Sequence, residues 1–328
     1  MENNKSFDEI REALNIKKTE DKIVTIKAIV CDMDGTLLNS NGEIDGKTLD
    51  KLITLQQNGI KLILASGRSY LRLLPDALKL EMDKNNGMII DVNGTSIYNV
   101  STEERNRLGI LDTEDIKKLN DYFSLFNVEI QYSQDDTVYT YLPEKIYTLK
   151  KNIRGEMKLP QDYPWMGGMF GWLCDTRDGY PNQHMIRDIN LSPEYCNKMS
   201  VVQDPHYMEF IKETLTNHPI YGDFEFVFSD ERKMEITYKN ITKGNALDEL
   251  LQLSGIENDE IVVFGDSEND ISMFHEKKFS VAMKNALPSA QQNANFVTNT
   301  NDNFGVFNML TQLEEQGHIQ SLPSSCLK

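Results

Sequence analysis

The stretch "AIVCDMDGTLL", residues 28–38, passes from apolar residues into two aspartates, a glycine and two leucines. The run from Ile26 to Val30 predicts a strand that is buried on both faces, as in a parallel sheet. A carboxylate at the end of such a strand is unfavourable unless a cation or hydrogen-bond donors compensate its charge. Asp32 and Asp34 stand where this strand meets its loop, and open α/β sheets bind their ligands at that edge.

Three interpretations of this aspartate pair can be compared. An aspartate before a glycine is typical of a capping or turn role. An EF-hand calcium loop needs a third ligand at position 5 and a glycine at position 6, whereas the glycine here is at position 4 counted from Asp32. Two carboxylates after an apolar strand suit a magnesium site in which one carboxylate oxygen also acts chemically.

Strand-like and helix-like segments alternate on either side of a different central region. The segments "KIVTIKAIV", "GKTLDKLITLQQNG" and "IKLILAS" predict a βαβ unit of a parallel sheet, and this character returns in "EIVVFGDSEND", "KFSVAM" and "NFVTN". Residues 96–238 instead mix tyrosine-rich strands with helices and the aromatic loop "LPQDYPWMGGMFGW". The sequence therefore predicts an α/β fold with a doubly wound, mostly parallel sheet. We expect a core domain at 23–95 and 239–328, and an inserted α+β cap domain at 96–238.

Composition narrows the function classes. The chain has 328 residues, of which 39% are apolar and 26% charged, as in a soluble globular protein. Its net charge of -17 argues against a nucleic-acid partner or an anionic membrane, which require basic surfaces. No signal peptide and no apolar run of about 18 residues is found, so we expect a cytoplasmic protein. The four cysteines form no CxxC pair and predict neither a zinc site nor a disulfide framework.

The polar residues 1–22 carry Phe7, Ile10 and Leu14 at helical spacing. This pattern is typical of a helical or partly disordered N-terminal extension.

A second acidic cluster follows another apolar strand in "VVFGDSEND", where Gly265 precedes Asp266, Asn269 and Asp270. A polar surface loop is the alternative, but three polar side chains clustered after a second buried strand argue against it, and a divalent cation would satisfy this cluster together with the first. In "LILASGRS", the hydroxyl of Ser66 and the backbone N–H groups around Gly67 could hold phosphate oxygens, although a serine after a strand is most often a helix N-cap.

Lys243 stands near a helix start in "NITKGNALDEL". An ammonium group there joins the helix dipole in favouring an anion, although a single lysine at such a position is usually solvated.

Taken in order, "DMDGT", Ser66, Lys243 and "GDSEND" resemble the four motifs of the haloacid dehalogenase superfamily. The chain is similar in particular to the Cof-type phosphatases, which carry a large C2-type α/β cap. "VNG" at 92–94, "MEIT", "VAMKNA" and "NFVTN" extend the resemblance over residues 24–312. The chain departs from the family at Lys284, where a glycine is more usual, and in the loop from Trp165 to Trp172.

The resemblance implies a mechanism for the aspartates. Asp32 would be the nucleophile that forms an aspartyl-phosphate, and Asp34 would protonate the leaving oxygen and then activate water. Mg²⁺ would be held by the Asp32 side chain, the Asp34 carbonyl and Asp266, with Asp270 bracing directly or through water. The implied phosphate-binding residues are Ser66, Gly67, Lys243 and Asn269, and the implied substrate contacts are Arg68 and Asn93.

The resemblance therefore implies a magnesium-dependent phosphatase that acts on a small phosphorylated metabolite, with a sugar phosphate as the favoured substrate. We expect a monomer or small homo-oligomer whose cap supplies selectivity and excludes water. One alternative is a phosphomutase with the same aspartate pair, which would release no free phosphate. Another is a catalytically silent regulator that binds a phosphorylated metabolite.

Overall fold

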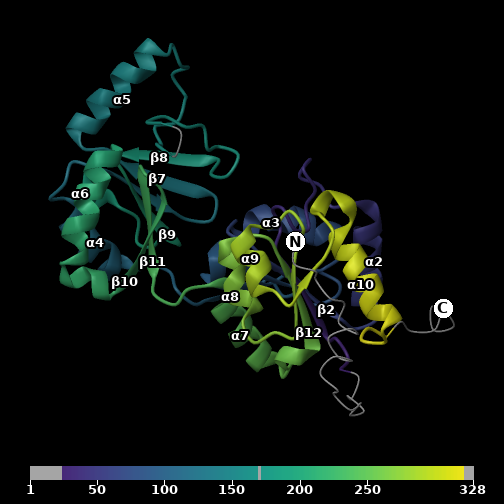
Figure 1. Ribbon diagram of the computed structural model, residues 1–328. Coiled ribbons are helices and arrows are strands. Elements are labelled where there is room, and N and C mark those ends of the chain that lie inside the picture. Colours follow the sequence, from purple (N-terminus) through teal and green to yellow (C-terminus); the bar gives the residue numbers. More distant parts are fainter. Residues whose placement is uncertain (1–23, 169–170, 321–328) are drawn as a thin grey trace, which may run out of the picture.

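The computed structural model describes residues 24–168 and 171–320. It contains two sheets, each with its own hydrophobic core, and Figure 1 shows them side by side. The extension predicted for residues 1–22, with Phe7, Ile10 and Leu14, lies outside the described residues, as does Cys326.

The larger sheet has the strand order β14-β13-β12-β1-β2-β3-β4-β5. Its strands run parallel from β14 to β3, and β4 and β5 are added antiparallel at the edge. β1 lies between β12 and β2, and all four of its residues are buried, as its apolar run predicts. The bounds are β1 Ala28–Cys31, β2 Lys61–Ala65, β3 Met88–Asp91, β4 Ser96–Asn99, β5 Arg105–Arg107, β12 Ile261–Gly265, β13 Phe279–Ala282 and β14 Phe296–Val297.

Helices cover both faces of this sheet, with α2 packed beside α10 and α7 beside α8 on the opposite side (Figure 1). The Asp45 side chain caps α2 by accepting a hydrogen bond from the backbone N–H of Thr48. The helices are α2 Gly46–Gln57, α3 Tyr70–Lys79, α7 Lys243–Ser254, α8 Ile271–Phe274, α9 Pro288–Asn293 and α10 Gly305–Glu315, with 3₁₀ turns η1 Val92–Gly94, η4 Asn258–Glu260, η5 Glu268–Asp270 and η6 Asn301–Asn303.

The smaller sheet, in the cap, has the order β10-β11-β9-β6-β7-β8. Its pairs are antiparallel except for β7 and β8, which run parallel. The elements of this region are α4 Thr113–Phe123, β6 Glu129–Ser133, β7 Thr137–Tyr141, α5 Glu144–Glu156, β8 Asn182–Ile186, η2 Ile189–Leu191, β9 Lys198–Val202, α6 Pro205–Thr216, η3 Pro219–Gly222, β10 Phe224–Asp230 and β11 Lys233–Tyr238. The predicted fold class, a doubly wound core with an inserted α+β cap, is confirmed.

The two faces of the cap sheet differ in character. Ile130 and Tyr132 point into the apolar cluster formed with α4 and α6, so Glu129 and Gln131 point to the other face. There the Gly167 N–H donates to Glu129 Oε1 at 2.8 Å, and Gln131 Nε2 donates to the Gly167 carbonyl at 2.7 Å. The aromatic loop after α5 therefore covers the polar face of the cap sheet.

The predicted boundary between residues 95 and 96 is wrong, because β4 and β5 pair with the core sheet. Antiparallel strands at the edge of a sheet that carry polar residues lack the apolar run that marks a buried parallel strand. The sequence pattern therefore changes at β4, although the chain leaves the core domain only after β5. The chain crosses into the cap after Arg107, where the N–H groups of Leu108 and Gly109 both donate to the Thr95 carbonyl.

The two crossings between core and cap lie against each other. A Cβ on Gly109 would lie 2.4 Å from Cδ1 of Ile241, which lies between β11 and α7. A hinge between core and cap would therefore involve residues 108–110 and 239–242.

Two expectations about the whole chain can be compared with the described residues. No helix among them is long and apolar enough to cross a membrane. Cys31, Cys174 and Cys196, the cysteines that the structure describes, are all free thiols.

Candidate active site

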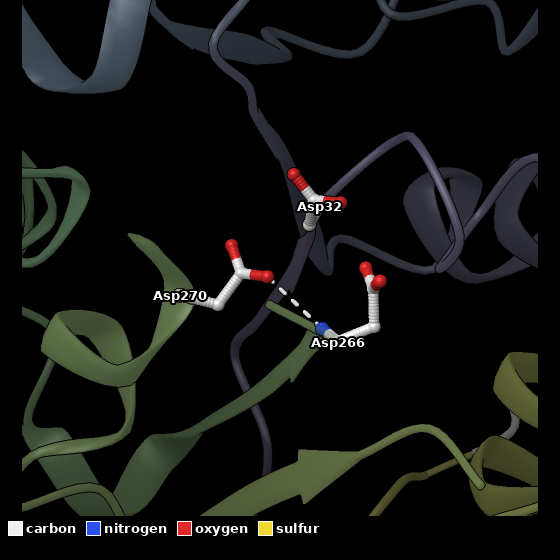
Figure 2. A group of neighbouring side chains, drawn as sticks. All are labelled: Asp32, Asp266 and Asp270. Carbon is white, nitrogen blue, oxygen red and sulfur yellow. Dashed lines mark hydrogen bonds between the residues drawn. The ribbon is translucent and has the colours of Figure 1, made fainter. Parts of the chain in front are cut away.

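Three carboxylates converge at the carboxyl ends of two neighbouring strands (Figure 2). Asp32 follows β1 directly and Asp266 follows β12 directly, and these strands are parallel and adjacent. Asp270 joins them from the end of η5. Carboxylate oxygens of Asp32, Asp266 and Asp270 all lie within 4.8 Å of one another. The sequence placed these residues correctly at one edge because the carboxyl ends of parallel strands meet there.

Asp270 also fixes the loop that carries Asp266. Its Oδ2 accepts hydrogen bonds from the backbone N–H groups of Asp266, drawn in Figure 2, and Ser267, at 2.9 and 3.0 Å. The Ser267 hydroxyl lies 3.1 Å from the same oxygen. Since Asp270 is completely buried, these donors stabilise its charge and hold the carboxylate in one position.

Lys243 is the first residue of α7, and its ammonium is buried among the carboxylates. Nζ donates to Asp32 Oδ1 at 2.5 Å and to Asp270 Oδ1 at 2.7 Å. Burial alone would lower the pKa of Lys243, but the two carboxylates raise it above its ordinary value. The raised pKa favours the charged form of Lys243. Its ammonium is hydrogen-bonded to Oδ1 of Asp32 and not to Oδ2.

The cluster has more negative charge than Lys243 can balance. Burial raises the pKa of Asp32 to about 7, with Lys243 opposing the rise and the charge of Asp270 adding to it. Burial also raises the pKa of Asp266. Three crowded carboxylates with one ammonium and oxygen-only ligands fit a divalent cation of the magnesium or calcium type.

The turn after β1 is shaped around this cluster. Gly35 has φ +79°, and a Cβ there would lie 2.6 Å from Asp266 Oδ2. Only glycine combines this conformation with so close an approach of backbone to carboxylate.

The side chain of Asp34 lies outside the carboxylate cluster and is paired with Arg68. Arg68 Nε donates to Asp34 Oδ2 at 2.8 Å, and Nη2 contacts the other carboxylate oxygen. The Asp34 side chain is 59% exposed, so it borders solvent. Arg68 was expected to contact substrate, whereas in this structure its partner is the predicted acid and base.

The predicted phosphate loop follows β2. Ser66 is buried, and its Oγ accepts from the Arg68 N–H at 3.1 Å, which leaves the hydroxyl proton for another acceptor. Gly67 packs against Asn93, since a Cβ on Gly67 would lie 3.2 Å from Asn93 Oδ1. That oxygen accepts from Asn269 Nδ2 at 2.9 Å, so Asn93 and Asn269 are brought together.

Two contacting residues were not among the predicted site residues. Thr36 Oγ1 donates to Asp266 Oδ1 at 2.8 Å, and Asn285 Nδ2 donates to the Gly35 carbonyl at 2.7 Å. Thr36 lies within the quoted stretch and could have been found there as a hydroxyl next to two carboxylates. Asn285 offered a weaker signal, its place shortly after the predicted strand "KFSVAM".

The fold and site define an α/β protein with an acidic centre at the carboxyl edge of its core sheet and an inserted cap. Residues 29–310 match the family model described as haloacid dehalogenase-like hydrolase, and the chain belongs to this family. The expected resemblance is confirmed.

Curated relatives that this chain matches over nearly their whole length are named as phosphatases. The 5-amino-6-(5-phospho-D-ribitylamino)uracil phosphatase YwtE of Bacillus subtilis is 27% identical over 88% of this chain and 98% of its own. Phosphatase YwpJ of the same organism is 24% identical, covering 88% of this chain and 100% of its own. The protein is thus a phosphoric monoester hydrolase of this family.

Solved structures agree with this assignment. A haloacid dehalogenase-like hydrolase from Bacteroides thetaiotaomicron matches with a TM-score of 0.68 and 25% identity, over 88% of this chain and 100% of that chain. TM0651 from Thermotoga maritima matches with a TM-score of 0.67 and 27% identity, over 88% and 97%.

Proposed function

We propose that the protein is a magnesium-dependent phosphatase that hydrolyses a small phosphorylated metabolite through an aspartyl-phosphate on Asp32, with a sugar phosphate as the favoured substrate. The observation that carries this proposal is the packing of Asp32 against Asp266, Asp270 and Lys243 at the carboxyl edge of the sheet. A bound Mg²⁺, held by Asp32, Asp266, the Asp34 carbonyl and Asp270, would supply charge neutralisation for the phosphoryl group.

Asp32 is suited to the nucleophilic role. Lys243 fixes one of its oxygens, Oδ1, and the other would attack phosphorus. In this first step a bond forms between the Asp32 oxygen and phosphorus, and the bond from phosphorus to the ester oxygen breaks. Covalent transfer to a carboxylate divides a difficult hydrolysis into two easier steps.

Asp34 is suited to moving the protons. It lies two residues from Asp32 and borders solvent, so it can give a proton to the leaving ester oxygen once its side chain turns away from Arg68. In the second step Asp34 takes a proton from water as the water oxygen attacks phosphorus. The bond from phosphorus to Asp32 then breaks, and inorganic phosphate is released.

The phosphate oxygens would be held by groups around Asp32. The Ser66 hydroxyl, the backbone N–H groups near Gly67 and the Lys243 ammonium are the donors at this edge. Asn269, in η5, would be a further phosphate-binding residue, and its Nδ2 donates to Asn93 Oδ1 at 2.9 Å, which positions its side chain. The name of the relative YwtE specifies a phosphate ester on a ribityl chain, which supports a sugar or polyol phosphate as substrate.

The test is a screen of sugar, polyol and aryl phosphates with detection of free inorganic phosphate. We expect turnover with Mg²⁺, little with Ca²⁺, whose looser geometry lets both Asp32 oxygens coordinate, and none after complete chelation. The Asp32→Asn protein is the control for contaminating phosphatases. Conversion of one phosphate ester into an isomer without free phosphate would identify a phosphomutase instead, and phosphate-ester binding without turnover would identify a regulator.

A further inference from the structure

Arg105, on the edge strand β5, connects the core to the cap. Its Nη2 donates to Asp91 Oδ2 of the core at 2.7 Å, and its Nη1 donates to Asp135 Oδ2 of the cap at 2.7 Å. Nε donates to Ser96 Oγ at 2.6 Å, and the guanidinium lies 4.5 Å from the centre of the Tyr70 ring. All of this is largely shielded from water, since the Arg105 side chain is 10% exposed.

On the core side, Asp91 holds the predicted phosphate loop in place. It ends β3, is completely buried, and accepts a hydrogen bond from the Tyr70 N–H, the first of α3, at 3.1 Å. The two residues after it bind the same loop, because the N–H of Val92 donates to the Arg68 carbonyl and that of Asn93 to the Ser66 carbonyl, each at 3.0 Å. A shift of Asp91 would therefore move the loop.

On the cap side, Asp135 lies in the turn between β6 and β7. Its Oδ1 accepts from Asn197 Nδ2 at 2.8 Å, and Asn197 is buried next to β9. Asp135 is thus fixed to the cap sheet, and a rotation of the cap would carry it along.

A second ion pair between core and cap is weaker. Arg72 of α3 lies 3.4 Å from Asp178, whose side chain is 99% exposed, and such exposed pairs contribute little. The Arg105 bridge instead joins a buried and a largely buried carboxylate through one planar group with fixed donor directions.

We propose that Arg105 is a positioning residue that couples the orientation of the cap to occupancy of the phosphate loop. One guanidinium binds both carboxylates only while β5 and the β6–β7 turn keep this relative placement. A change at either end weakens the bond at the other, and such coupling is reciprocal. The inference rests on the proposed function, because it takes the loop at Ser66 as the phosphate site.

The test follows the shape of the full-length protein by small-angle X-ray scattering, with Mg²⁺ alone and with inorganic phosphate added. Asp135→Asn removes the charge that Arg105 binds in the cap. Asp136→Asn is the matched control, because it removes a carboxylate next to Asp135 that does not contact Arg105. Among the described contacts, the Asp136 carboxylate accepts only from Thr137 and Asn182 of the cap, both at 2.8 Å. Arg105→Lys keeps the charge but loses the planar fork.

We expect phosphate to change the scattering profile of the wild-type and Asp136→Asn proteins. It should leave that of Asp135→Asn and Arg105→Lys unchanged, although both still bind phosphate in a thermal-shift assay. In kinetics, Asp135→Asn should change KM for a sugar phosphate by roughly fivefold or more with a smaller effect on kcat, whereas a merely structural role would reduce the active fraction and leave KM alone.

Two results would overturn the inference: an Asp135→Asn protein that responds to phosphate as Asp136→Asn does, or a wild-type protein whose profile phosphate does not change. Neither result concerns ester hydrolysis. Conversely, a phosphate-driven change in the wild-type protein, lost in Asp135→Asn, would support the inference even if no ester were hydrolysed and the proposed function failed.

Discussion

The burial of Asp32 conflicts with the negative charge that its proposed roles require. As the proposed nucleophile and metal ligand it would have to be ionised, yet burial raises its pKa to about 7 despite the hydrogen bond from Lys243. A second positive charge resolves this conflict, since a bound cation favours the ionised form. Metal binding and deprotonation of Asp32 should therefore be linked.

The linkage gives a pH dependence with a definite sign. The raised pKa means that Asp32 is mainly protonated below pH 7 in the metal-free protein, so a cation must displace a proton to bind there. We expect the apparent affinity for Mg²⁺ to fall about tenfold for each pH unit below the pKa and to level off above it. Calorimetric titration from about pH 5.5 to about pH 8.5 measures this. An affinity that does not vary between neutral and acidic pH would contradict it.

Asp32 and Asp34 should fail differently when each is changed to asparagine. Asp32→Asn cannot form a phosphoenzyme with any substrate, because an amide is not a competent nucleophile. Asp34→Asn should still be phosphorylated by an aryl phosphate, whose leaving oxygen needs little protonation, and should then accumulate the adduct because water lacks its base. Intact-protein mass spectrometry after rapid acid quench detects the adduct, and peptide mapping locates it.

The two variants serve as controls for each other in this experiment. Both lose one negative charge within the same loop, but Asp32 is buried and Asp34 is exposed, so a thermal melt of each variant checks its folding separately. Labelling of Asp32→Asn as readily as Asp34→Asn, or of a residue other than Asp32, would show that the nucleophile was wrongly assigned.

At the scale of elements, the turn after β1 can approach the Asp266 carboxylate because Gly35 has no side chain. Gly35→Ala would add a Cβ 2.6 Å from Asp266 Oδ2, whereas the same change at Gly42, with φ +76°, meets nothing within 4 Å. Both variants should lose roughly 1 kcal/mol of stability from the positive φ. Only Gly35→Ala should also need more Mg²⁺ for half-maximal activity, because Asp266 must move.

Magnesium titrations and thermal melts of the two glycine variants separate these effects. Equal requirements for Mg²⁺ would mean that the turn does not position Asp266.

The elements also show why the sequence predicted some features and not others. The carboxylates after β1 and β12 were predictable, because an apolar run followed by a charge marks both the strand and the edge at which it ends. The pairing of β4 with β3 was not, because antiparallel edge strands with one polar face leave a weak pattern. The pairing of Arg68 with Asp34 depends on two loops meeting in space, which no local pattern encodes.

Within the cap, Glu129 of β6 and Lys150 of α5 form an ion pair that is completely buried. Burial lowers the pKa of Lys150, and the nearby carboxylate of Glu129 opposes this. Lys150→Met should destabilise the protein by about 3–5 kcal/mol, because it leaves a buried carboxylate unpaired.

The double variant Lys150→Met with Glu129→Gln should recover most of this loss, since neither charge of the pair remains. Chemical unfolding of the single and double variants measures the coupling. A double variant as unstable as the sum of its singles would mean that the two residues act independently.

At the scale of the whole molecule, the acidic cluster and the aromatic loop belong to different sheets. The carboxylates, Lys243 and Ser66 all lie at one edge of the core sheet, where they can contact a phosphate group but little else of a metabolite. The cap presents the aromatic loop, in which the Trp165 ring lies tilted against Tyr147, with ring centres 5.1 Å apart. The Arg154 guanidinium lies 4.3 Å from the centre of the Trp165 ring. Recognition of the rest of a substrate would then be a property of the cap.

Replacing "YPWMGGMFGW", residues 163–172, by a glycine-serine segment tests this division of labour. The loop is anchored at Gly167 and at the Trp165 carbonyl, which accepts from Lys150, so its replacement changes the covered face of the cap sheet. We expect the ratio of kcat/KM for a sugar phosphate to that for an aryl phosphate to fall roughly tenfold or more, because closure over the larger substrate loses its contacts. The Mg²⁺ requirement should stay the same.

Leu125→Ser, on a 77% exposed residue after α4, is the control for a change elsewhere in the cap. A substrate profile that is unchanged across the whole screen would exclude the loop from recognition, and a changed Mg²⁺ requirement would mean that core and cap do not divide their tasks in this way.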